Sequence, residues 1–244
     1  MSIEVSVVTP TYNRRKFIPT LIQLYKNQTF PKEKMEWIII DDGRDKVADL
    51  FQEAAKEIPN LRYYYVDEKM RIGAKRNLLN KEARGDIIVA MDDDDYYPAN
   101  RVQSVVDAFK KNPKIDLVGS SEMYLYYLDT KKVYVMGPYG PNHATNGTMG
   151  WRKRYATAHL YNEYVTKAEE ESFLDGYKHK MIQLDPKKTI VVMCHTHNTA
   201  DKHALRDSHF AHKERKPDFL LRETNYKLSD FIKEPSLLSF YSQL

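Results

Sequence analysis

Ile87-Ile88-Val89-Ala90-Met91-Asp92-Asp93-Asp94-Asp95 is the stretch of sequence that decides the fold. Its five apolar residues predict a short buried strand, and the aspartates follow directly at the carboxyl end of that strand. In an open α/β sheet this edge is where ligands bind. Carboxylates crowded together repel one another unless a cation lies among them, so the run predicts a site for Mg²⁺ or Mn²⁺. The alternative is a solvated acidic turn before a helix that Pro98 opens.

Strand-like and helix-like segments alternate before this run. Residues 3–9, 37–40 and 61–66 read as strands, whereas residues 14–25, 46–57 and 73–83 have helical periodicity. This alternation predicts βαβ units, and therefore an α/β fold with a mixed, mainly parallel sheet flanked by helices. The strand at 37–40 ends at Asp41-Asp42, which places a second pair of carboxylates at the same edge.

A possible anion site lies directly before the aspartate strand. Gly73-Ala74-Lys75-Arg76-Asn77 opens the third expected helix. Backbone N–H groups, the helix dipole and two cationic side chains would converge there on an anion such as a phosphate. The alternative is a solvated basic first turn, although cations at a helix N-terminus oppose the dipole.

The second half of the chain departs from the regular alternation of strands and helices. Residues 117–128 and 133–136 read as β-structure around a hairpin turn at 129–131, and residues 137–150 read as a loop. A helix is expected over 166–173 and a strand over 190–193. The tail, residues 201–244, has a weak amphipathic pattern and is expected to form a helical extension that packs on the domain.

Composition restricts the class of protein. The chain has 244 residues, of which 42% are hydrophobic and 30% charged, with a formal net charge of +4. This balance suits an anionic small ligand better than nucleic acid. The single cysteine excludes a disulfide framework and a cysteine-built zinc site. We find neither a signal-peptide pattern nor an apolar run of about 20 residues, so we expect a cytoplasmic, soluble protein without a transmembrane anchor.

Four segments in this order resemble glycosyltransferases of family 2, which have the GT-A fold. They are Thr9-Pro10-Thr11-Tyr12-Asn13-Arg14, Ile39-Ile40-Asp41-Asp42-Gly43, the Gly73–Asn77 segment and Met91-Asp92-Asp93-Asp94-Asp95. The resemblance implies a Rossmann-like GT-A domain over residues 1–200. Residues 1–112 would form its nucleotide-binding half and residues 113–200 its acceptor-binding half, followed by the extension over 201–244.

The resemblance also implies roles for residues in the first half. Nucleotide and donor binding would fall to Pro10, Tyr12, Asp41, Asp42, Lys75, Arg76, Asp92 and Asp93. Among them, Pro10, Tyr12 and Asp41 would hold the nucleobase. In the Asp-x-Asp element, Asp92 would reach the ribose and Asp94 would bind the metal. Four consecutive aspartates leave this register open by one residue, so Asp93 and Asp95 are alternatives.

The second half resembles the family less closely. Glu169-Glu170-Glu171-Ser172-Phe173 occupies the place of the usual Glu-Asp-x-x-Phe. Glu170 would be the catalytic base, with Glu171 as the alternative, and a helix N-terminus is expected to keep it ionised at neutral pH. A plain acidic helix start is the other interpretation. The segment Thr148–Arg152 resembles the family's strand before the base, on the acceptor side.

A histidine segment completes the resemblance. His195-Thr196-His197-Asn198-Thr199 resembles a late His-x-x-Asn-Thr segment, in which His195 would bind the metal or touch the diphosphate. Strand-end histidines that face solvent are the alternative.

Together the motifs predict a metal-dependent, inverting glycosyl transfer. The donor would be a nucleotide-diphospho-sugar, a UDP-sugar being favoured, the acceptor would be a hydroxyl of a molecule such as a glycan, and the cofactor would be Mn²⁺ or Mg²⁺. A sugar-phosphate nucleotidyltransferase and a non-catalytic sugar-binding module are the alternatives.

Overall fold

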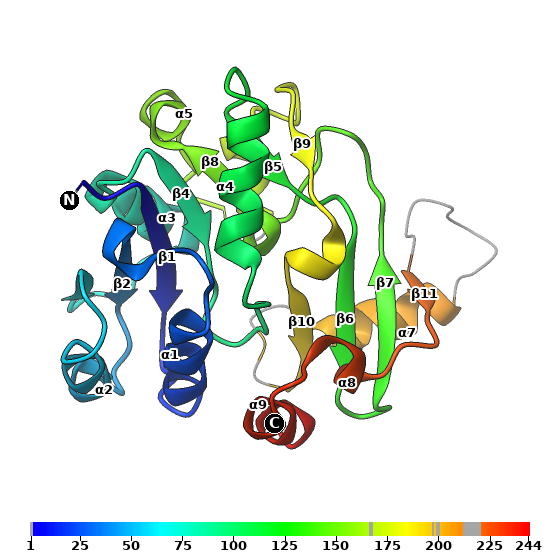
Figure 1. The fold of residues 1–244 in the computed structure, drawn as a ribbon. Helices are drawn as coiled ribbons and strands as arrows, with labels where there is room; N and C mark the ends of the chain where they lie inside the picture. The colour runs from blue at the N-terminus through cyan, green and yellow to red at the C-terminus, as the bar shows by residue number, and fades with distance from the viewer. Residues whose placement is uncertain (1, 166–167, 197, 199–200, 212–220) are drawn as a thin grey trace.

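The structure is a computed structural model, and it describes residues 2–165, 168–196, 198, 201–211 and 221–244. Two sheets lie side by side in it (Figure 1). The strands of the larger sheet, in spatial order, are β3 (Leu61–Tyr65), β2 (Met35–Asp41), β1 (Val5–Thr11), β4 (Ile87–Ala90), β8 (Gly150–Arg152), β5 (Leu117–Gly119) and β9 (Ile182–Gln183). Those of the smaller sheet are β10 (Val191–Cys194), β6 (Met123–Tyr127), β7 (Lys132–Met136) and β11 (Leu221–Glu223).

Strand direction brings the acidic segments together. β1 pairs in parallel with both β2 and β4, and β2 pairs in parallel with β3. Within the larger sheet, as far as the structure describes it, β8 alone runs antiparallel to its neighbours, which are β4 and β5. The register places Thr11 beside Asp41 and Val8 beside Ala90, so the carboxyl ends of three strands meet at one edge. The predicted mixed, mainly parallel α/β sheet is confirmed.

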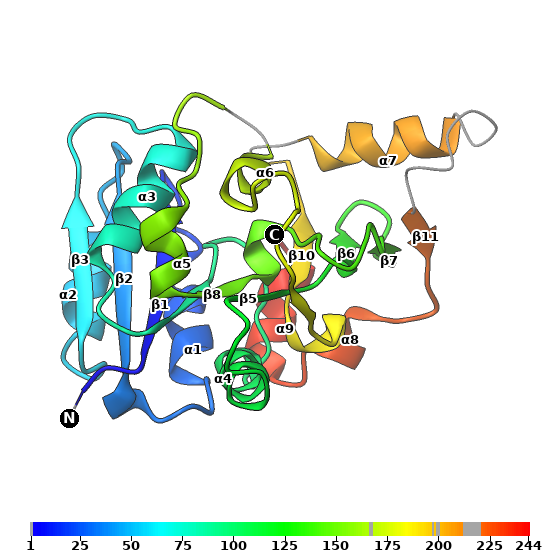
Figure 2. The same cartoon turned by 90° about the horizontal axis from the view of Figure 1, so that it is seen from above.

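Helices cover both sides of the two sheets. The α-helices are α1 (Ile18–Lys26), α2 (Ala48–Ala54), α3 (Ile72–Glu82), α4 (Arg101–Lys111), α5 (Lys153–Ala158), α6 (Glu169–Phe173), α7 (Lys202–Ala211), α8 (Leu228–Phe231) and α9 (Pro235–Ser242); the short 3-10 turns are η1 (Lys32–Lys34), η2 (Asn146–Thr148) and η3 (Pro186–Lys188). Figure 2 shows α3, α5, α6 and α7 on one side, with α1, α4, α8 and α9 on the other. None of the helices in the described part of the chain is both long and apolar enough to span a bilayer.

The core fixes the strands that carry the site. Every residue of β1 and β2 is buried. Trp37 of β2 stacks on Tyr25 of α1 with ring centroids 4.5 Å apart, and Phe51 of α2 meets its edge at 5.4 Å. Strands buried on both faces have little freedom to shift, so the loops at their carboxyl ends are held in place.

Two of the helices that begin later than expected, α1 and α4, follow a turn. The helix predicted from Arg14 is a turn over its first residues, in which the Phe17 N–H donates to the Arg14 carbonyl at 2.8 Å, and α1 begins at Ile18. Pro98 likewise lies before α4, in a turn that the Arg101 N–H closes at 2.9 Å. In both places a turn separates the strand end from the helix, because the chain must redirect there.

The tail is helical only in part. It supplies α7, α8 and α9, but also β11, which pairs antiparallel with β7. Its last helix lies against the aspartate run, since the Tyr241 hydroxyl donates to the Asp95 carbonyl at 2.8 Å. The Tyr96 hydroxyl donates to the Phe231 carbonyl of α8 at 3.2 Å. The tail therefore supports the loop that carries the candidate site.

Candidate active site

A cavity of about 720 Å³ lies where the two sheets meet. Its walls come from the carboxyl ends of β1 and β4, from the first turn of α3, from α6 and α7, and from one face of the smaller sheet. Most of the side chains predicted to act in binding or catalysis are among its lining residues.

Pro10 and Tyr12 line this cavity, whereas Asp41 and Asp42 lie just behind its wall. Asp41 is buried and accepts hydrogen bonds from the Tyr63 hydroxyl at 2.7 Å and the Gly43 N–H at 2.8 Å. Its position is therefore fixed by the protein itself. The ring of Tyr12 lies 4.3 Å from the ammonium of Lys69.

Asp42, directly after β2, forms an ion pair with Lys75 of α3. The Lys75 ammonium forms an ion pair with Asp42 and donates to the Thr11 carbonyl at 2.9 Å. Asp42 also accepts from the Met70 N–H at 2.6 Å. Burial lowers the pKa of Lys75, and the charge of Asp42 opposes this effect. The pair places a cation at the cavity wall next to β1.

Arg76 joins the two acidic segments that the sequence singled out. Its Nη1 lies 3.2 Å from Asp92 Oδ1, and its Nε donates to Glu169 Oε1 at 2.9 Å. The side chain is 8% exposed and therefore shielded from competing water. Arg76 thus ties the end of β4 to the start of α6, which positions Glu170 relative to the aspartates.

Gly73 has a packing role that the sequence did not reveal. A Cβ at this position would lie 2.3 Å from the Asn162 carbonyl oxygen. The glycine therefore lets the backbone before α6 approach α3 closely. The first turn of α3 contributes to the site mainly through the side chains of Lys75 and Arg76, which line the cavity.

The four aspartates have four different environments. Asp92 pairs with Arg76. Burial and the adjacent charge of Asp94 raise the pKa of Asp93. Asp95 accepts from the Met193 N–H at 2.9 Å, and burial raises its pKa to about 7. Asp95 is thus a structural link between the run and β10.

Asp94 has the most cationic surroundings of the run. Its Oδ2 lies 3.3 Å from Arg14 Nη2 and 3.4 Å from His195 Nε2. Burial alone would raise the pKa of Asp94, but the hydrogen bond with His195 and the charge of Lys202 outweigh it, and the pKa is lowered. Asp94 is therefore held as a carboxylate at neutral pH.

His195 is buried beside this carboxylate. Its ring stacks on Phe17 with centroids 5.2 Å apart, and its Nε2 lies 3.2 Å from Asn198 Nδ2. The Asn198 side chain also accepts from the His195 N–H at 2.7 Å and donates to the Met193 carbonyl at 3.0 Å. The asparagine of the predicted His-x-x-Asn segment thus holds the histidine toward Asp94. His197 and Thr199 lie outside the described residues.

The three glutamates point in different directions. Glu169 pairs with Arg76, Glu170 lines the cavity and is 9% exposed, and Glu171 is exposed and outside the lining. Burial raises the pKa of Glu170 to about 7, with the charge of Glu169 adding to it. The expectation that a helix start keeps Glu170 ionised at neutral pH is wrong, because α6 is a single short turn and burial outweighs its dipole.

Sequence reasoning missed Arg14, Asn198 and Lys202. Arg14 was assigned to a helix, but the turn before α1 directs it to Asp93 and Asp94. Lys202, at the start of α7, lines the cavity, and the aspartates raise its pKa against the effect of burial. Two of them lie in quoted segments, Arg14 at the end of Thr9–Arg14 and Asn198 in the His-x-x-Asn segment, whereas Lys202 lies in none.

Two side chains of the cavity region could serve as ligands of a metal ion. Among the described residues, no three side chains of His, Cys, Asp or Glu converge closely enough to hold a metal by themselves. Asp94 Oδ2 and His195 Nε2, however, lie 3.4 Å apart, and both are ligand types that Mn²⁺ accepts. Two protein ligands fit a cation whose remaining ligands are phosphate oxygens of a substrate and water.

Comparison with known proteins identifies the family. The model of glycosyl transferase family 2 matches residues 6–159, which is more than half of the chain, so the chain belongs to this family. The poly(ribitol-phosphate) beta-N-acetylglucosaminyltransferase TarS of Staphylococcus aureus is 31% identical over 93 residues, 37% of this chain and 16% of that protein. The matched regions cover only 13% to 40% of the curated relatives' own lengths.

Solved structures share the fold. The S. aureus TarS 1–349 structure in complex with UDP-GlcNAc has a TM-score of 0.66 and 18% identity, covering 81% of this chain and 60% of that one. The mannosyltransferase PcManGT of Pyrobaculum calidifontis, in complex with GDP-Man and Mn²⁺, has a TM-score of 0.66 and 14% identity, covering 99% and 70%. These likenesses confirm the expected GT-A type of α/β fold.

Proposed function

We propose that this family 2 chain is a metal-dependent, inverting glycosyltransferase that moves a sugar from a UDP-sugar to a hydroxyl group of a glycan acceptor. The observation that carries the proposal is that one cavity holds a buried carboxylate, Glu170, together with the Asp92–Asp95 run and the cations Lys75 and Arg76. A base, a cation-binding carboxylate and anion-binding groups are the parts that sugar transfer from a diphosphate requires.

The donor would bind along the carboxyl ends of β1, β2 and β4. Pro10 and Tyr12 offer an apolar and an aromatic surface for the base, and Asp41 lies behind them as a fixed acceptor. Lys75, paired with Asp42, and Arg76, paired with Asp92, supply positive charge near the phosphates. The TarS complexes with UDP and UDP-GlcNAc support UDP as the nucleotide.

Asp94 and His195 would hold Mn²⁺ or Mg²⁺. The cation would neutralise charge on the departing diphosphate. Lys202 and Arg14 lie at the same carboxylates and would add to the positive potential there. The Mn²⁺ complex of PcManGT supports a metal in this fold.

Glu170 would act as the general base. Its carboxylate takes the proton of the acceptor hydroxyl while that oxygen attacks the anomeric carbon, and the bond to the diphosphate breaks with its electron pair. A single displacement of this kind inverts the anomeric configuration. Residues 1–112 would then form the donor half of the domain and residues 113–200 the acceptor half, because Glu170 and the strands β6, β7 and β10 belong to the latter.

The test is release of UDP from UDP-sugars with and without Mn²⁺, in the wild type and in two matched variants. Glu170→Gln should retain UDP binding and lose turnover by about 10²- to 10⁴-fold, the usual contribution of a positioned base. Glu171→Gln, its exposed neighbour, should turn over normally. Wild-type turnover in Glu170→Gln would contradict the assignment of the base, and a product with retained configuration would contradict the single displacement.

A further inference from the structure

Three nitrogen-bearing side chains crowd one oxygen of Asp94. Arg14 Nη2 lies 3.3 Å from Asp94 Oδ2, His195 Nε2 lies 3.4 Å from it, and the amide of Asn198 donates to it at 3.4 Å. A divalent cation bonded to the same oxygen would lie only about 2.1 Å from it. Such a cation therefore needs room that one of the three side chains occupies.

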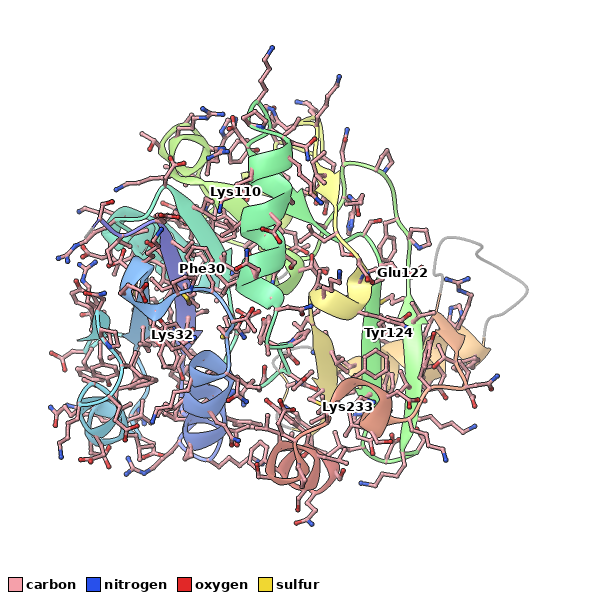
Figure 3. The ribbon with its side chains drawn as sticks, in the orientation of Figure 1. Phe30, Lys32, Lys110, Glu122, Tyr124 and Lys233 are labelled. Carbon is pink, nitrogen blue, oxygen red and sulfur yellow. The ribbon has the colours of Figure 1, made fainter. Side chains whose placement is uncertain are left out.

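Two of the three side chains are held firmly by the protein. The ring of His195, directly after β10, stacks on Phe17, directly before α1, and side chains fill the space between these two elements in Figure 3. The side chain of Asn198 accepts from the His195 N–H at 2.7 Å and donates to the Met193 carbonyl at 3.0 Å. Moving either of them would break contacts within the fold.

Arg14 is the neighbour with room to turn. It has the longest side chain of the three, lines the cavity and is 15% exposed. Its ion pairs with Asp93 at 3.6 Å and with Asp94 at 3.3 Å are longer than the 2.7–2.9 Å or so of a close charge-assisted hydrogen bond. Its charge also repels a metal cation, whereas the imidazole of His195 is a ligand that Mn²⁺ accepts.

Arg14 supplies positive charge to two adjacent carboxylates. Burial raises the pKa of Asp93, and the charge of Arg14 opposes this rise. Against the effect of burial, the hydrogen bond with His195 and the charges of Lys202 and Arg14 lower the pKa of Asp94. A divalent cation at Asp94 would compensate the same negative charge, so the carboxylates do not need Arg14 and the cation together.

We propose that Arg14 competes with the divalent cation for Asp94, and that it turns from this carboxylate to the diphosphate of the donor when cation and nucleotide bind. The inference rests on the proposed function, because it takes Asp94 as the metal ligand. Every charge stays paired in this exchange, since Arg14 leaves one anion and meets another in the same cavity. The protein alone should therefore bind the cation weakly, and UDP should strengthen its binding.

The first measurement is Mn²⁺ binding without nucleotide, followed by the loss of the paramagnetic resonance signal of free Mn²⁺. Arg14→Met removes the charge and keeps most of the length of the side chain. It should bind Mn²⁺ at least about tenfold more tightly than the wild type, the lower end of what a unit charge within 4–6 Å does to an ionic equilibrium.

Arg15→Met is the matched control. Arg15 is the next residue in the chain, but its guanidinium pairs with Asp49, whose side chain is 60% exposed. Its loss should leave Mn²⁺ binding unchanged. Arg14→Lys keeps the positive charge and should bind Mn²⁺ as the wild type does, so it serves as a second variant if Arg14→Met folds poorly.

The second measurement titrates UDP into the same variants at saturating Mn²⁺. Arg14→Met should bind UDP about tenfold more weakly than the wild type, because a hydrogen bond to a charged group is lost. The two effects have opposite signs, tighter Mn²⁺ and weaker UDP. General damage to the site would weaken the binding of both.

Equal Mn²⁺ affinity of the wild type and Arg14→Met would overturn the competition, and weaker binding of both ligands would overturn it as well. Unchanged UDP affinity would overturn the turn toward the diphosphate. Asp94→Ala tests the proposed function separately in the same assay. If this variant binds Mn²⁺ as tightly as the wild type, the metal ligand is wrongly assigned, whatever the result for Arg14→Met.

Discussion

Glu170→Gln should make the folded protein more stable at pH 8, although it removes the proposed base. Burial raises the pKa of Glu170 from 4.5 to about 7. Because one pKa unit corresponds to about 1.4 kcal/mol, ionising this carboxylate costs about 3 kcal/mol more in the folded protein than in the unfolded chain. Glutamine has nearly the same shape and carries no charge, so the variant avoids this cost.

The sign of the effect follows from proton binding. Between pH 4.5 and 7 the folded protein holds the proton of Glu170 more tightly than the unfolded chain does. The free energy of unfolding therefore falls as the pH rises through this window. The stabilising contribution is complete below pH 4.5 and lost above pH 7, so the advantage of the variant grows through this window and is complete above neutrality.

Thermal unfolding at pH 5 and pH 8 measures this prediction. For a chain of this size, about 3 kcal/mol corresponds to a difference in melting temperature of about 6–12 °C. We expect most of this difference at pH 8 and little of it at pH 5. Glu171→Gln, at an exposed position, is the control and should show no such dependence. If Glu170→Gln melts at the wild-type temperature at pH 8, the carboxylate is not held in an environment that disfavours its charge.

The remaining predictions concern the pH profile and the cations. Since the pKa of Glu170 is raised to about 7, kcat/KM at low acceptor concentration should rise with pH through about 7, and a rate independent of pH from 5 to 9 would exclude it as the base. Asp94→Ala should abolish Mn²⁺-dependent UDP binding in calorimetry with an unchanged circular dichroism spectrum; unchanged affinity would contradict its role. Lys202→Met should weaken UDP binding about tenfold, as expected for loss of one charge-assisted contact, and unchanged binding would restrict Lys202 to a structural role.

The fold of the first half was predictable because its central strands β1, β2 and β4 are buried on both faces. Continuous apolar runs such as Trp37–Ile40 and Ile87–Met91 leave few alternatives to a parallel sheet. The turns at Arg14 and Pro98 were not predictable, since their geometry depends on where the next helix must pack. β11 was also missed, because a three-residue strand has almost no periodicity and depends on its pairing with β7.

The candidate site was predictable where a motif marks it, at the strand ends and at the start of α3. Motif spacing led to Lys75 and Asp94, which the topology brings to one cavity. Three consecutive glutamates do not by themselves separate Glu170 from Glu171. The orientation of the short helix α6 does so, because it buries Glu170 and leaves Glu171 exposed. Lys202 carries no motif, because its place depends on how the tail folds back.

The aspartate run also shows how identical residues acquire different tasks. Successive side chains along the run point in different directions, so each meets its own neighbours. Asp92 meets Arg76, and Asp95 meets the backbone of β10. Asp93 and Asp94 lie between these two. Burial raises the pKa of Asp93, whereas the neighbouring cationic groups lower the pKa of Asp94 and keep it ionised. A cation needs a carboxylate that stays ionised and that has a second ligand beside it, and Asp94, with His195 Nε2 at 3.4 Å, meets both conditions. We therefore propose Asp94, rather than Asp93 or Asp95, as the metal ligand in the register that the sequence left open.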